Sequence, residues 1–109
     1  MSLTADDARR LALALPDAIE ADHHGRPSFR VAGKIFATLW DPEHLNVMLG
    51  PEQIRAAVER APDVCSEVWW GKKLSAVRVE LAAISPRELE AMLAEAWSLR
   101  APQRLLGEG

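Results

Sequence analysis

The chain has 109 residues, of which 13 are Lys or Arg and 16 are Asp or Glu, so its formal net charge is −3. Hydrophobic residues make up 49% of the chain and charged residues 27%, values that are typical of a globular domain and exclude a disordered chain. The longest uninterrupted apolar run, residues 11–15, is far shorter than the roughly 20 residues that span a bilayer, which excludes a membrane-spanning helix.

The first predicted element is a helix that begins after Thr4 and ends at Pro16. Thr4 can cap this helix, and Asp7, three residues later, completes an approximate capping box. Its buried stripe, at helical spacing, consists of Ala8, Leu11, Ala12 and Leu15. The following residues 17–27 are typical of a turn-rich connection, with at most one short strand near residues 18–21.

Alternation of apolar and polar residues then predicts a hairpin. Its strands cover residues 28–31 and 34–40, and the loop between them is Ala32-Gly33. A two-residue loop that contains glycine suits a hairpin because its turn requires positive φ. A four-residue turn over residues 41–44 leads to a third alternating strand over residues 45–49.

A second helix opens with Gly50-Pro51 and ends near Pro62. The next residues, 63–75, are compatible with a strand, a bulge or a loop, and clean alternation then predicts a strand over residues 76–81.

The third helix has the clearest start in the chain. Ser85 can cap it, Pro86 suits its first turn, and Glu88 completes a capping box. The helix ends at Pro102, so we expect one domain over residues 1–102 and a frayed C-terminal tail over residues 103–109.

The two predicted turns determine which side chains share a face of the sheet. The first turn pairs Phe29 with Phe36, and the second pairs Trp40 with Leu45. The face predicted to lie under the helices carries Phe29, Val31, Phe36, Thr38, Trp40, Leu45, Val47 and Leu49. The opposite face carries Ser28, Arg30, Ile35, Ala37, Leu39, Asn46, Met48, Arg78 and Glu80. This second face is either a partly covered, solvated surface or an interaction surface, and a one-residue error in either turn would exchange the two faces.

The four tryptophans are predicted to divide between core and surface. Trp97 falls on the apolar stripe of the third helix, and Trp40 falls on the face assigned to the core. If Trp69 and Trp70 lie in one strand, they point to opposite sides, so we expect one of them at the surface.

Positive charge gathers in two segments that contain no acid, residues 23–40 and residues 68–79. Their cations are Arg26, Arg30, Lys34, Lys72, Lys73 and Arg78. Beside neighbouring aromatic residues, such cations could contact the phosphates of a nucleic acid. The alternative is that strands carry their cations outside the core, while acids gather in the first turns of helices.

No residue pattern indicates catalysis or a metal site. Asp22-His23-His24 offers three possible ligands, but neighbouring histidines on an extended segment point to opposite sides. Cys65 has no partner cysteine, which excludes an internal disulfide, and we expect it to be a small buried residue. We therefore expect no metal, no cofactor and a cytoplasmic location.

Residues 25–37 read Gly-Arg-Pro-Ser-Phe-Arg-Val-Ala-Gly-Lys-Ile-Phe-Ala. This segment resembles the signature of the MmcQ/YjbR-like family of small bacterial proteins, Gly-x-Pro-x-Phe-x-Val-x-Gly-Lys-x-Phe-Ala. The similarity extends to the Leu-Pro step after the first helix, the Pro-Glu opening of the second, and the Lys pair before Val77-Arg78-Val79. Many members carry an aromatic residue after that Lys pair, where this chain has Leu74.

The resemblance implies an α+β fold. It predicts an antiparallel sheet of about five strands with three helices mainly on one face, in the order α-β(3)-α-β(2)-α, as in secretion-chaperone-like and frataxin-like architectures. It implies no catalytic residue, and it suggests DNA binding through a double-wing arrangement of hairpins.

The leading functional hypothesis is a non-enzymatic protein that binds DNA weakly and in a salt-sensitive manner. Its phosphate contacts would be Arg26, Arg30, Lys34, Lys72, Lys73 and Arg78. The first alternative is an adaptor that binds a protein partner through the open sheet face or a sheet edge. The second is a small-ligand or enzymatic role centred on Asp22, His23 and His24.

Overall fold

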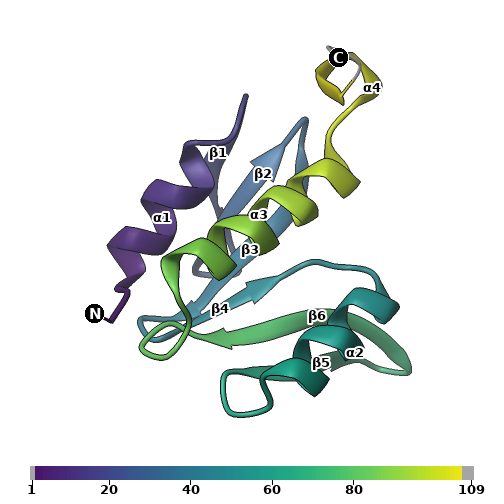
Figure 1. Cartoon of the computed structure of the whole chain (residues 1–109). Helices are drawn as coiled ribbons and strands as arrows, with labels where there is room; N and C mark the ends of the chain where they lie inside the picture. The colour runs from purple at the N-terminus through teal and green to yellow at the C-terminus, as the bar shows by residue number, and fades with distance from the viewer. Residues whose placement is uncertain (1, 107–109) are drawn as a thin grey trace.

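The computed structural model describes residues 2–106, which form four helices and one six-stranded sheet (Figure 1). In chain order the elements are α1 (Ala5–Leu13), β1 (Ile19–His23), β2 (Arg26–Val31), β3 (Lys34–Asp41), β4 (His44–Val47), α2 (Pro51–Arg60), β5 (Cys65–Trp70), β6 (Lys73–Glu80), α3 (Pro86–Arg100) and α4 (Gln103–Leu106). All neighbouring strands are antiparallel, in the order β1-β2-β3-β4-β6-β5. The predicted α+β class is confirmed.

The sheet has six strands where about five were predicted. The extra strand is β1, so four strands rather than three precede α2, and the segment without a clear pattern forms the β5–β6 hairpin. Of the expected C-terminal tail, residues 103–106 form the short helix α4, and residues 107–109 lie outside the described part of the chain.

Local capping signals account for the starts of the helices. Thr4 Oγ1 accepts a hydrogen bond from the Asp7 amide at 3.2 Å, and Asp7 Oδ2 accepts one from the Thr4 amide at 2.8 Å. Ser85 Oγ likewise accepts from the Glu88 amide at 3.1 Å at the start of α3. These bonds satisfy amides that a helix N-terminus leaves without partners. The capping box predicted at Thr4 is confirmed, whereas at Ser85 the cap forms without the predicted return bond from the Ser85 amide to Glu88 within residues 2–106.

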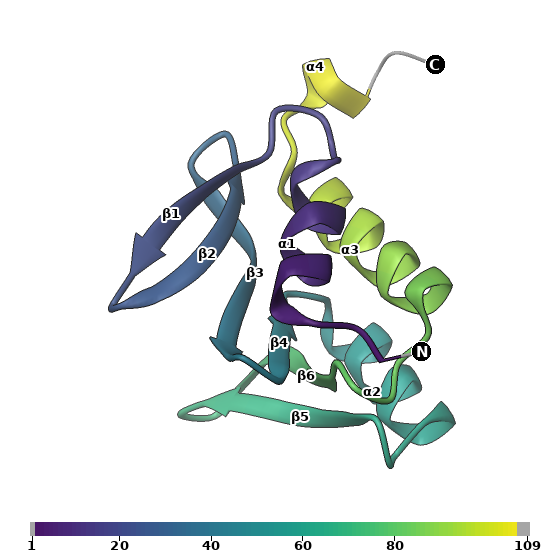
Figure 2. The same cartoon turned by 90° about the vertical axis from the view of Figure 1, so that its left-hand side faces the viewer.

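Helices α1, α2 and α3 all lie on one side of the sheet, and the β1–β2 and β5–β6 hairpins extend away from them on the other (Figure 2). We call the sheet surface opposite the helices the open face. The core lies between the sheet and the helices, and its largest fully buried side chains include Phe29, Phe36, Leu45, Ile54, Leu81, Leu89 and Leu93.

Two bulges in β3 alter the predicted faces. Near the first turn Arg30 pairs with Ile35 as expected, but Phe29 then pairs with Ala37. Phe36 therefore has no partner in β2 and forms a bulge. The extra residue reverses the alternation beyond it. Ala37 and Leu39, predicted on the opposite face, are buried in the core, whereas Thr38, predicted in the core, lies on the open face.

The second bulge corrects the position of Trp40. Leu39 pairs with Leu45 and Asp41 pairs with His44, which leaves Trp40 without a partner and reduces the loop to two residues. The predicted pair of Trp40 with Leu45 is therefore wrong, and so is the burial of Trp40, which is 38% exposed on the open face.

Trp69 and Trp70 are both exposed, whereas the sequence predicted only one at the surface. A bulge between Val68 and Trp69 interrupts the regular alternation of β5 at this point. Cys65, at the start of the same strand, is buried as predicted. Burial raises the pKa of its thiol, so the thiolate that reacts with oxidants or metals is disfavoured.

His44 connects the β3–β4 turn to β6 through two carboxylates. Its Nδ1 lies 2.8 Å from Asp41 Oδ1, and its Nε2 lies 2.6 Å from Glu80 Oε2. The hydrogen bonds to Asp41 and Glu80 raise the pKa of His44 above its usual value of 6.5, although burial acts in the opposite direction.

The raised pKa of His44 predicts that stability falls as pH rises. A group whose folded-state pKa exceeds its unfolded value stabilises the fold fully below the unfolded value, here 6.5, and loses this effect as pH passes the folded value. Urea unfolding of the wild type should show a lower free energy of unfolding at about pH 8.5 than at about pH 5.5, by less than about 1 kcal/mol because the carboxylates are half exposed. The His44→Gln variant should lack this component. Equal pH dependence in both proteins would contradict the assignment.

Thr38 is a buried polar residue whose hydroxyl makes no hydrogen bond within the described part of the chain. A buried hydroxyl without a partner costs about 1–3 kcal/mol, so Thr38→Val, which preserves shape, should raise the free energy of unfolding by up to about 1 kcal/mol. The matched control is Ser28→Ala, because Ser28 Oγ donates to the Ala21 carbonyl at 2.8 Å. Thermal melts should show a higher Tm for Thr38→Val and a lower one for Ser28→Ala. A lower Tm for both would mean that the Thr38 hydroxyl is satisfied.

Candidate functional site

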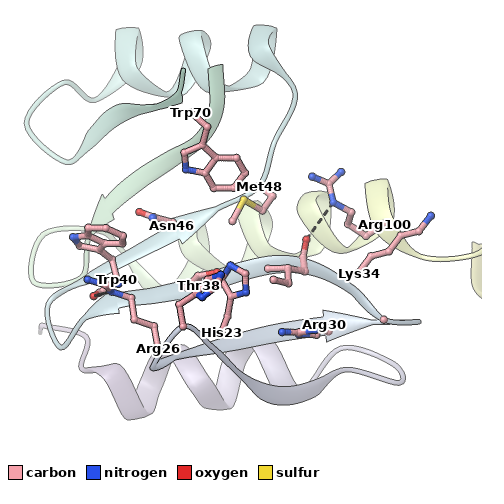
Figure 3. Close-up of a pocket in the computed structure, with 13 residues that line it drawn as sticks. His23, Arg26, Arg30, Lys34, Thr38, Trp40, Asn46, Met48, Trp70 and Arg100 are labelled. Carbon is pink, nitrogen blue, oxygen red and sulfur yellow. Dashed lines mark hydrogen bonds between the residues drawn. The ribbon is translucent and has the colours of Figure 1, made fainter. Parts of the chain in front are cut away.

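The open face contains a hollow of about 630 Å³ at its centre (Figure 3). It is lined by His23, His24, Arg26, Arg30, Gly33, Lys34, Ile35, Thr38, Trp40, Asn46, Met48, Trp70 and Arg100. Its volume lies in the range of about 300–1,000 Å³ that is usual for ligand sites. Four of the lining residues are Arg or Lys and none is acidic, so the hollow is suited to an anion.

Three arginines at this hollow are oriented by neutral oxygen atoms. Arg26 Nε donates to the Trp40 carbonyl at 2.8 Å, and Arg100 Nε donates to the Ile35 carbonyl at 3.2 Å. Arg30 Nε donates to Ser28 Oγ at 3.0 Å. Because these acceptors carry no charge, each guanidinium is fixed in place without losing its positive field.

Trp40 holds two arginines, Arg26 and Arg78, at one end of the hollow. The guanidinium carbon of Arg26 lies 3.9 Å from the centre of the Trp40 ring, and that of Arg78 lies 4.3 Å from it. Arg78 Nε also donates to Asn46 Oδ1 at 2.9 Å. Cation–π contacts and a neutral amide thus hold two like charges beside one indole ring.

A second hollow of about 620 Å³ adjoins the first and shares Trp70 and Arg100 with it. Its other cations are Arg55 on α2 and the pair Lys72 and Lys73 at the tip of the β5–β6 hairpin. Of residues 2–106, no acidic one lines this hollow either. We call the two hollows together the basic groove.

Seven of the 13 Lys and Arg residues line the basic groove, and no Asp or Glu within residues 2–106 does. These cations are Arg26, Arg30, Lys34, Arg55, Lys72, Lys73 and Arg100. Within residues 2–106 the ion pairs use other cations, namely Arg9, Arg10, Arg60, Arg104 and His44. The charge of the groove is therefore not compensated by neighbouring carboxylates.

The structure brings the six predicted phosphate contacts to one side of the molecule. Arg26, Arg30 and Lys34 line the first hollow, and Lys72 and Lys73 line the second. Arg78 lines neither hollow, but it stacks on Trp40, which lines the first. Sequence reasoning missed Arg55 and Arg100 because they belong to helices and lie outside the two acid-free segments of the sequence. Each becomes part of the groove only through the packing of its helix, for which the sequence has no local signal.

Asp22, His23 and His24, which were considered for an enzymatic role, contact neighbouring residues of the β1–β2 turn. Asp22 Oδ2 accepts a hydrogen bond from the Gly25 amide at 3.2 Å in the β1–β2 turn, where His24 and Gly25 both have positive φ. The rings of His23 and His24 lie 4.5 Å apart at the edge of the first hollow. Among residues 2–106 no group of three or more His, Cys, Asp or Glu side chains could hold a metal ion. None of the helices in that part of the chain is long and apolar enough to cross a membrane.

Comparisons with known proteins agree with the fold. A family model described as YjbR matches residues 13–99. A crystal structure of Deinococcus radiodurans protein DR2400, which carries the domain DUF419, is similar with a TM-score of 0.76 at 21% identity, over 90% of this chain and 78% of that one. No curated protein matches the chain. Because the matched segment covers most of the sequence and contains the whole sheet, α2 and nearly all of α3, the chain belongs to the YjbR family.

Proposed function

We propose that this protein is a non-enzymatic DNA-binding protein that contacts the phosphate backbone through its basic groove. The observation that carries the proposal is a groove lined by seven cations, with no acidic residue lining it and no ion pair to any of them within residues 2–106. A chain with net charge −3 that gathers seven cations without ion pairs in one groove is suited to a polyanion.

The hairpins support this proposal by their placement. The β1–β2 and β5–β6 hairpins both extend away from the helices, on either side of the open face (Figure 2). The tip of the second carries Lys72 and Lys73, and His23 and His24 lie at the tip of the first. Two charged or ionisable tips that flank a basic face correspond to the wings predicted from the family resemblance.

The same groove is compatible with an acidic segment of a protein partner, which is the outcome that the experiment must separate from DNA. Binding to DNA releases the counterions that surround its phosphates. The logarithm of the binding constant therefore falls steeply and linearly with the logarithm of the salt concentration. We expect three or four phosphate contacts, because not every groove cation reaches one strand. The net negative charge should limit the affinity to about micromolar or weaker at physiological salt.

The first test is fluorescence anisotropy with labelled duplex and single-stranded DNA at several salt concentrations. The slope of log K against log salt should be roughly −3, from about 0.7–0.9 per phosphate contact. Lys34→Gln together with Lys73→Gln, one from each hollow, should reduce the magnitude of this slope by up to about 2. Both lysines are exposed, so their removal should leave the fold intact.

The matched control is Arg10→Gln together with Arg87→Gln, which changes the net charge equally but lies on the helical side. This variant should bind with the slope of the wild type. Equal losses in the two double variants would mean that total charge rather than the groove determines binding. If neither form of DNA binds at low salt, the DNA proposal is wrong and the protein-partner alternative becomes the leading one.

A further inference from the structure

The first hollow of the basic groove, which we call the central hollow, is deeper than contacts with phosphates require. Thr38, Asn46 and Met48 line it although they are only 5%, 3% and 4% exposed, so they form a recessed floor. A DNA duplex presents phosphates and sugars on its outside and keeps its bases stacked within. A duplex lying on the cations of the rim would therefore leave this floor without a contact.

The Thr38 hydroxyl is the second observation that points to a ligand. Thr38 lines the hollow, and its Oγ1 has no hydrogen-bond partner within residues 2–106. Buried hydroxyls in native proteins nearly always have a partner, so an unpartnered one in a hollow is suited to a ligand atom. The edges of nucleobases carry both donors and acceptors, and a hydroxyl can bind either.

The walls of the hollow present aromatic rings from strands at opposite edges of the sheet. His23 belongs to β1 and Trp70 belongs to β5, and Figure 3 shows them on opposite sides of the floor that Thr38 and Met48 form. Trp70 is 56% exposed, which leaves much of its indole ring uncovered. Trp40, by contrast, already stacks with two arginines, so its ring positions their guanidinium groups.

Cations flank these aromatic walls at both ends. Figure 3 shows Arg30, Lys34 and Arg100 toward one end of the hollow and Arg26 beside Trp40 at the other. A nucleotide in a single strand has a phosphate on each side of its base. An aromatic slot between two groups of cations matches that arrangement, in which phosphates contact the charges while the base stacks on the indole.

We propose that the central hollow binds one unpaired nucleobase against Trp70 and above Thr38, so that the protein selects single-stranded DNA over duplex. The proposal rests on the proposed function and specifies its substrate. It commits to a base because the floor is recessed, the Thr38 hydroxyl on it has no hydrogen-bond partner within residues 2–106, and the flanking charges lie at both ends.

The experiment compares three probes with the same label: a ten-nucleotide oligothymidine, an abasic strand with the same phosphates, and a ten-base-pair duplex. Because stacking on an aromatic side chain strengthens binding by about tenfold per base, the oligothymidine should bind at least about tenfold more tightly than the abasic strand. It should also quench tryptophan fluorescence, whereas the abasic strand should not. The chain contains no tyrosine, so its intrinsic fluorescence comes from its four tryptophans.

Two variants test whether the preference for oligothymidine over the abasic strand arises in the central hollow. Trp70→Leu and Thr38→Val should each reduce the preference for oligothymidine over the abasic strand, while their binding to the abasic strand stays within about twofold of the wild type. A merely structural role would weaken binding to both probes equally. The control is Trp69→Leu: Trp69 is exposed beside Trp70 and lines the second hollow rather than the central one, so this variant should keep the wild-type preference for oligothymidine over the abasic strand.

The outcomes separate this inference from the proposed function. Salt-dependent binding of all three probes with equal affinity, or Trp70→Leu and Thr38→Val variants that retain the wild-type preference, would overturn base binding and leave phosphate binding intact. No binding to any probe at low salt would overturn both proposals.

Discussion

The register of β3 determines what each face of the protein can do. In this strand Phe36 has no partner in β2, and Trp40 has no partner in β4. The first bulge directs Ala37 and Leu39 into the core and places Thr38 on the open face. The second frees Trp40 from pairing, so that its ring can stack with arginines from β2 and β6. Without these bulges, a threonine would lie under the helices and two aliphatic positions would lie on the open face.

The charge of the groove persists because its arginines are held by groups that do not neutralise them. Backbone carbonyls, one serine hydroxyl, one amide and one indole ring take the place that carboxylates usually occupy. On the helical side the pattern is reversed: Arg9 pairs with Asp6 and Glu20, and Arg10 pairs with Asp7. An arginine fixed by neutral partners has lost part of its side-chain freedom before a ligand arrives, so less entropy is lost when it binds.

Much of the fold could be predicted because its signals are local. The caps at Thr4 and Ser85 and the Ala32-Gly33 turn each involve residues that are neighbours in the sequence, and the structure shows all three. A bulge has no such signal, because both Phe36 and Ala37 are apolar and either could face the core. Likewise the cationic strand residues were predicted as a group, whereas Arg100 joins them only because α3 packs against β3. What sequence reasoning missed depends on contacts between distant segments.

The separation of charge affects the order in which contacts can form. A polyanion approaching the helical side meets the acidic first turns of the helices, whereas the basic groove presents seven cations and, within residues 2–106, no carboxylate. Long-range attraction therefore orients the protein before any side chain touches its ligand, although the net charge is negative. Such attraction does not distinguish one form of nucleic acid from another. Discrimination must come from short-range contacts, and on this face those available are the recessed floor with the Thr38 hydroxyl and the uncovered ring of Trp70.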